Sequence, residues 1–305
     1  MSQLKPDRIV LHCGLHKTGS TYIQRNLQTN RELLLKQGVL YLGPNTFKKR
    51  CSELWRHLQW GRWDRKTSKR LKSQTRTTLM ELAGEHPQNI HTIVLSFEAI
   101  FGTLRNGLAE PPSRRTPNKE RKTGLYRYAK SRTKRLMIGL EDSLQHQSIA
   151  WTLLFASRDP EAFVRSCHTQ LLKEGRHTPE TSNFGTFRQT ADFSHTDPQQ
   201  LEQTLRKLGG KRDLKVVSIN YDQASDPQEP STFLWNVLKQ ALPQQDDRLR
   251  QQLEANTDND NLNKTTNPGL NERGLELAIQ ARPLFSRSEW KLFRKFLEKN
   301  FAKSR

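Results

Sequence analysis

"LHCGLHKTGSTYIQ", residues 11–24, joins an apolar run to a helical pattern through a turn that contains two glycines, a lysine and three serine or threonine residues. The apolar run, residues 8–13 (RIVLHC), is short and rich in branched side chains, which predicts a buried strand. Apolar residues then recur with helical spacing over residues 18–36, which predicts a helix. The stretch therefore predicts a strand, a glycine-rich turn and a helix in direct succession.

The same alternation returns along the chain. Further strands are expected at residues 91–97, 150–157 and 214–221, and further helices at residues 160–173 and 232–241. Strands separated by helices predict an α/β fold with a central parallel sheet flanked by helices, and such sheets bind ligands at the carboxyl ends of their strands. We expect a single domain over residues 1–305, with a helical C-terminal part from about residue 246.

Charge and cysteine content narrow the class of protein. A formal charge of +20 indicates an anionic partner, either a polyanion or a small molecule. Three widely spaced cysteines without a CxxC pair argue against a disulfide framework or a zinc site and favour a reducing compartment. The sequence lacks a signal-like N-terminus and any apolar stretch of about 18 residues, which predicts a soluble cytoplasmic protein without a transmembrane segment.

Two basic stretches, residues 48–76 and 105–135, interrupt the alternation where connections between strands are expected. One interpretation is a solvated charged face and a mobile loop. The other is an inserted surface that receives an acidic substrate, with Trp55, Trp60 and Trp63 offering flat faces to sugar rings or bases. The sequence leaves both interpretations open.

The glycine-rich turn has the composition of an anion site. A turn between a strand and a helix N-terminus directs backbone N–H groups at one point, and the helix dipole adds partial positive charge there. Lys17 supplies a full charge. Hydrogen bonds to an anion can be donated by the hydroxyl groups of Thr18, Ser20 and Thr21. In the NTPase P-loop, G-x-x-x-x-G-K-[ST], the lysine follows the second glycine, whereas here it precedes Gly19, which disfavours an ATPase or GTPase. The simpler alternative is a strand-to-helix turn with a solvated lysine.

A second motif lies in "WTLLFASRDPEAFVRSCHTQLL", residues 151–172. Arg158 ends the expected strand, and Ser166 comes two turns into the following helix, so the two side chains could face a second anionic group. Arg158 and Asp159 would otherwise only cap the helix. The position of the motif after a parallel strand favours a role in binding.

Together the two motifs resemble those of the sulfotransferases that use 3'-phosphoadenosine 5'-phosphosulfate (PAPS). "GLHKTGST" is similar to the 5'-phosphosulfate loop of that family, and "RDPEAFVRS" to its 3'-phosphate motif. The resemblance implies a P-loop NTPase-like sulfotransferase fold, with PAPS as donor and 3'-phosphoadenosine 5'-phosphate (PAP) as product. It also implies that the 3'-phosphate is held by Arg158 and Ser166, and the 5'-phosphosulfate by Gly14, Lys17, Thr18, Gly19, Ser20 and Thr21. Looser similarity extends to residues 216–224 and 263–277.

The implied reaction is transfer of a sulfuryl group to a hydroxyl or amine, without a metal. Lys17 would stabilise charge on the leaving group, and a base would remove the proton of the acceptor. The candidate bases are Glu98, His16 and His168. Glu98 follows an expected strand in "SFE", similar to a Ser-Ser-Glu-like segment of related sequences, and could instead orient Lys17 or cap a helix. His16 could contact nucleotide or acceptor or pack in the loop, and His168 is expected to be a surface or helix-packing residue.

The basic stretches favour an anionic or carbohydrate acceptor over a small phenol, and the absence of a membrane anchor suggests a bacterial enzyme. Two other classes remain open. A nucleotide or small-molecule kinase would be expected to show a Walker lysine and a magnesium-binding carboxylate. A non-catalytic polyanion-binding or nucleic-acid-binding protein would show strong salt dependence without needing Lys17. We expect no nucleic-acid partner, while peripheral contact with a membrane stays open.

Overall fold

The computed structural model describes residues 4–60, 65–85, 87–109, 124–145, 148–224, 231–242, 249, 251–253, 256 and 269–303. The chain divides into two compact units. The first unit contains Met1–Phe101, Tyr128–Ser157 and Pro198–Leu262, and the second contains Gly102–Arg127, Arg158–Asp197 and Asn263–Arg305. The glycine-rich turn belongs to the first unit.

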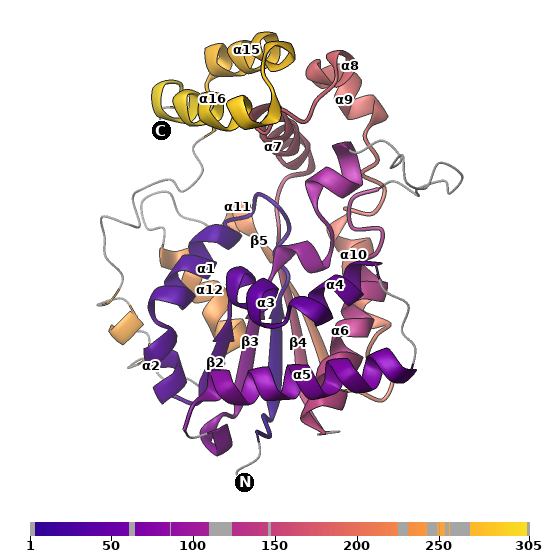
Figure 1. Cartoon of the computed structure of the whole chain (residues 1–305), viewed down its shortest axis with the longest axis vertical. Coiled ribbons are helices and arrows are strands. Elements are labelled where there is room, and N and C mark those ends of the chain that lie inside the picture. Colours follow the sequence, from indigo (N-terminus) through magenta and orange to yellow (C-terminus); the bar gives the residue numbers. More distant parts are fainter. Residues whose placement is uncertain are drawn as a thin grey trace. The chain divides into compact units, whose positions relative to one another are not determined.

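The first unit is built on a five-stranded sheet whose strands are all parallel. The strands are β1 (Arg8–His12), β2 (Val39–Leu42), β3 (Thr92–Ser96), β4 (Ala150–Ser157) and β5 (Leu214–Asn220), in the order β2-β3-β1-β4-β5 (Figure 1). This arrangement confirms the predicted α/β class with a central parallel sheet. β2 was not predicted, because VLYL is a four-residue strand, too short to show a pattern.

The order of the strands places the glycine-rich turn at a distinctive point of the sheet. The segment after β1 connects it to β2, at one edge of the sheet. The segment after β4 connects it to β5, at the opposite edge. Neighbouring parallel strands with connections to opposite sides form a topological switch point, where open α/β sheets bind their ligands. β1 and β4 are such neighbours, with His12 paired to Leu154.

Helices cover both faces of the sheet (Figure 1). On one face α1 (Ser20–Thr29), α2 (Arg31–Lys36) and α12 (Ser231–Ala241) enclose a core that includes Val10, Leu27 and Leu238. On the other face α6 (Ala129–Leu144) packs on β4, where Trp151 Nε1 donates to Glu141 Oε1 at 3.0 Å. The single helix expected over residues 18–36 is interrupted at Asn30, whose backbone and side-chain N–H groups both bond to the carbonyl of Asn26.

The basic stretch at residues 48–76 is helical where it is described. The stretch forms the end of α3 (Pro44–Arg50), then α4 (Ser52–Trp60) and the first half of α5 (Arg65–Ala83). Buried residues are four apart in each of the last two helices, Leu54 and Leu58 in α4 and Leu71 and Thr75 in α5, which leaves basic residues outside. The described part of this stretch is therefore helix with an exposed basic side, which agrees with a solvated charged face and not with a loop. In the stretch at residues 105–135, the π-helical turn η3 (Arg105–Ala109) and the start of α6 are described, and residues 110–123 lie outside the described part.

The remaining short elements of the first unit are η1 (Pro87–Asn89), η2 (Glu98–Ile100), α10 (Pro198–Arg206) and α11 (Tyr221–Ala224). The second unit is helical where it carries regular secondary structure. It contains α7 (Pro160–Lys173), α8 (Pro179–Ser182), α9 (Phe184–Thr190), α15 (Glu272–Ala281), η4 (Arg282–Leu284) and α16 (Arg287–Asn300). Among the residues that the structure describes, no helix is both long and apolar enough to cross a bilayer.

Candidate functional site

The turn after β1, here called the glycine loop (residues 13–19), is held in an unusual backbone conformation. Gly14, Lys17 and Gly19 have φ angles of 37°, 67° and 74°. Glycine adopts such angles freely, but for a lysine this region is sparsely populated and costs free energy. Strain of this kind persists where the surrounding structure enforces it, and it is concentrated at functional sites.

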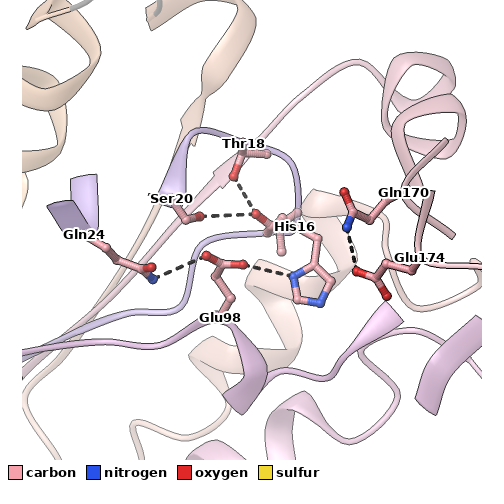
Figure 2. Close-up of polar contacts among 8 residues, drawn as sticks. His16, Thr18, Ser20, Gln24, Glu98, Gln170 and Glu174 are labelled. Carbon is pink, nitrogen blue, oxygen red and sulfur yellow. Dashed lines mark hydrogen bonds and ion pairs between the residues drawn. The ribbon is translucent and has the colours of Figure 1, made fainter. Parts of the chain in front are cut away.

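The loop is closed by its own hydroxyl groups (Figure 2). Thr18 Oγ1 donates to the carbonyl oxygen of Leu15 at 2.7 Å, and Ser20 Oγ approaches the same oxygen at 3.5 Å. Both side chains are buried, and a Cβ on Gly14 would overlap Ser20 Oγ. Thr21 is the exposed hydroxyl residue of the motif.

The first turn of α1 has the partial positive charge of a helix N-terminus. The helix begins at Ser20 with Gly19 as its N-cap, which supplies no side-chain hydrogen bond, and its first turn has no acidic residue. The N–H groups and dipole of a helix N-terminus therefore lie beside partly exposed Lys17. Because this point lies at the end of β1, next to the switch point, the arrangement suits a phosphate-type anion.

Glu98 joins the glycine loop to α1. It begins η2 directly after β3, which places it beside the loop, as its position after an expected strand predicted. Its Oε2 lies 3.3 Å from His16 Nδ1, and its Oε1 accepts a hydrogen bond from Gln24 Nε2 at 3.3 Å (Figure 2). The side chains of His16 and Glu98 are 10% and 25% exposed, so the pair is largely shielded from solvent.

His12 forms a second buried polar contact below the loop. It ends β1, and its Nδ1 lies 2.8 Å from Ser96 Oγ on β3. Burial lowers the pKa of His12 to about 4, although the negative charge of Glu98 acts in the opposite direction. His12 is thus a neutral structural residue. Sequence reasoning missed it because its partner depends on the pairing of β1 with β3.

Two aromatic rings lie against Gly19. A Cβ at this position would come within 2.9 Å of the rings of Phe233 and Tyr221, which contact each other edge to face at 5.0 Å. Tyr221 directly follows β5, and Phe233 lies in α12. Neither ring was predicted to lie beside the loop, because only tertiary packing brings them there. The rings require a residue without a side chain at position 19.

The second motif belongs to the other unit. Arg158 is its first residue after β4, and Ser166 lies in the second turn of α7; both are partly exposed. Asp159 caps α7: its Oδ1 accepts a hydrogen bond from the backbone N–H of Ala162 at 2.8 Å. The sequence had allowed this capping role as an alternative to binding. The glycine loop, with its residue His16, and Glu98 belong to the first unit.

His168 has the packing role expected of it. Its Nε2 lies 2.9 Å from the carbonyl oxygen of Thr181, and its ring packs on Phe184 and Phe187. Burial is the main reason that its pKa is lowered. Trp55 is partly buried and packs on Phe97, with ring centres 4.4 Å apart. The side chain of Trp60 and all of Trp63 lie outside the described residues.

In the described part of the chain, no group of three or more histidine, cysteine or acidic residues is arranged to hold a metal ion. A comparison with protein-family models and one with curated proteins find no match to this chain. The functional interpretation therefore rests on the residues of the site.

Proposed function

We propose that the protein is a sulfotransferase that moves a sulfuryl group from PAPS to a hydroxyl or amine, with a carbohydrate as acceptor, in the cytoplasm of a bacterium. The observation that carries the proposal is the conformation of Lys17. A lysine in the left-handed region, between two left-handed glycines and next to a helix N-terminus without a side-chain cap, suits an anion bound at the end of β1.

The residues of the loop fit a phosphosulfate group. Lys17, the exposed hydroxyl of Thr21 and the N–H groups of the first turn of α1 are donors suited to its oxygens. The hydroxyls of Thr18 and Ser20 are directed to Leu15, so we expect these two residues to contribute through their backbone. By the resemblance, Arg158 and Ser166 would hold the 3'-phosphate.

PAPS supplies the sulfuryl group, and PAP is the leaving group. Negative charge grows on the leaving side as the bond to sulfur breaks, and the ammonium of Lys17 stabilises that charge. Because this charge is greater in the transition state than in the bound donor, we expect Lys17 to contribute to the rate as well as to binding.

The contact between His16 and Glu98 favours one assignment of the base. If the hydrogen on Nδ1 is directed at Glu98, the imidazole of His16 would use Nε2 to accept the proton of the incoming hydroxyl. Both oxygens of Glu98 are already in contact with His16 and Gln24. We therefore assign His16 as the base and Glu98 as the residue that orients it.

Isothermal titration with PAP, AMP and ATP tests the proposal. Wild-type protein is expected to bind PAP with micromolar affinity and AMP much more weakly, while Lys17→Ala and Arg158→Ala lose PAP binding. Lys36→Ala, which removes an exposed lysine at the end of α2, serves as the charge-matched control and should bind normally. Preference for ATP would favour a kinase, and equal or absent binding of all three nucleotides would leave a polyanion-binding protein.

A further inference from the structure

The C-terminal helix α16 and the turn before it expose an unusual amount of apolar surface. Among the described residues, four large hydrophobic side chains are exposed, and three of them lie in this segment: Leu284 at 79%, Leu292 at 70% and Phe296 at 49%. Leu292 and Phe296 are four residues apart, so they occupy one stripe on successive turns of the helix. Adjacent exposed apolar residues of this kind indicate an interaction surface.

The stripe is presented by a rigid support. Phe296 stacks on Phe293 with ring centres 5.9 Å apart, and Phe293 stacks on Phe285 at 4.9 Å. On the opposite side of the helix Trp290 and Leu297 are buried in the core of the second unit. The helix therefore keeps its orientation while Leu292 and Phe296 face outward.

A row of lysines borders this stripe. Lys291, Lys295 and Lys299 are all exposed and follow one another at four-residue spacing. Of the two acidic residues in α16, Glu289 caps the helix start through Ser286, and Glu298 pairs with Lys173 and Arg294. Residues 282–303 hold seven basic and two acidic residues, a net charge of +5.

We propose that this face of α16 docks the protein on an anionic lipid bilayer. A protein partner would be served by the apolar stripe alone and a polyanion by the lysines alone, whereas the combination suits an interface of acyl chains and negative headgroups. Lysines beside the stripe can extend their charged ends to headgroups while their stems lie along apolar surface. The inference rests on α16 and does not depend on the proposed enzymatic activity.

Sedimentation of the full-length protein with vesicles tests the docking. We expect binding to phosphatidylcholine vesicles that contain phosphatidylglycerol and little binding to pure phosphatidylcholine. Exchange of Lys291, Lys295 and Lys299 for glutamine should weaken binding about fivefold for each lysine. Exchange of exposed Lys66, Lys69 and Lys211 for glutamine removes the same charge elsewhere and should have little effect.

The apolar stripe is tested separately with Leu292→Gln/Phe296→Gln, which should also lose vesicle binding. Tyr128→Gln, at a site exposed to a similar degree (45%), is the control. Unchanged far-ultraviolet circular dichroism and thermal midpoint would show that these surface variants fold. Full vesicle binding by Leu292→Gln/Phe296→Gln would overturn the proposal and point to a polyanion site. If this variant binds vesicles fully but loses self-association, the apolar stripe is instead a contact between copies of the chain.

Discussion

Glu98 Oε2 lies 3.3 Å from His16 Nδ1, although one residue follows β3 and the other follows β1. The two side chains meet because parallel neighbours end at the same edge of the sheet. The contact gives the glycine loop a carboxylate partner that the anion-binding motif itself lacks.

If His16 is the base, its removal should affect turnover more than nucleotide binding. His16→Ala is expected to lower kcat about 100-fold or more, since a positioned base contributes roughly that factor, with PAP affinity nearly unchanged. Glu98→Gln should lower kcat less, because it disturbs only the orientation of His16. Production of PAP from PAPS with a carbohydrate acceptor, beside PAP titration, provides the measurement. A greater loss in Glu98→Gln than in His16→Ala would reverse the two roles.

Gly19 is expected to be far less tolerant of a side chain than Gly84, although both have a left-handed backbone, with φ of 74° and 72°. A Cβ at Gly84 meets no atom within 4 Å, so Gly84→Ala should cost about 1–2 kcal/mol from backbone strain alone. At Gly19 the rings of Phe233 and Tyr221 add overlap, which costs about 1–3 kcal/mol more. Urea unfolding of both variants measures the difference, and equal losses would show that the rings move aside freely.

The burial of His12 predicts an acid-sensitive fold. Its pKa is about 4 in the folded chain and near 6.5 when unfolded, so the unfolded state binds the extra proton between these values. Stability should therefore fall as the pH drops from 6.5 toward 4, by about 1.4 kcal/mol for each pH unit across the middle of that window. In His12→Asn the slope should be smaller; it should not vanish, because burial also lowers the pKa of His177 to about 4. Urea unfolding of both proteins at several pH values measures this dependence. The same dependence of stability on pH in His12→Asn and in the wild type would contradict the prediction.

Lys173 is 1% exposed and pairs with Glu298 at 2.9 Å, so loss of the carboxylate should be costly. Glu298→Gln leaves a buried ammonium without this charge partner and is expected to lower stability by about 2–4 kcal/mol. The matched exchange Glu202→Gln breaks a pair with Arg206 on the surface of α10 and should cost less than about 1 kcal/mol. Similar losses in the two variants, measured by thermal unfolding, would mean that Lys173 finds another partner or water.

The elements with strong local patterns were predicted accurately from the sequence. β4 at Ala150–Ser157 and α7 at Pro160–Lys173 have the expected bounds, because a continuous apolar run and an Asp-Pro cap mark their limits. The break at Asn30 and the short strand β2 were not predicted, since neither has a distinctive residue pattern.

Some residues of the candidate site could likewise be predicted from the sequence, and others could not. The glycine loop could be predicted because its residues are contiguous in the sequence. The position of Glu98 at the edge of the sheet could be predicted because Glu98 follows a strand. The ring of Phe233 beside Gly19 and the contact of His12 with Ser96 depend on packing between distant segments, which periodicity does not encode.

The central position of β1 has a consequence for folding. β1 precedes the other four strands of the sheet in the chain, and its neighbours β3 and β4 begin only at Thr92 and Ala150. Pairings so distant along the chain must overcome the entropy of closing long loops, which slows folding. On the ribosome, both edges of β1 can be covered only after Ala150–Ser157 has been synthesised, and during that interval its unpaired edges and apolar residues are open to aggregation.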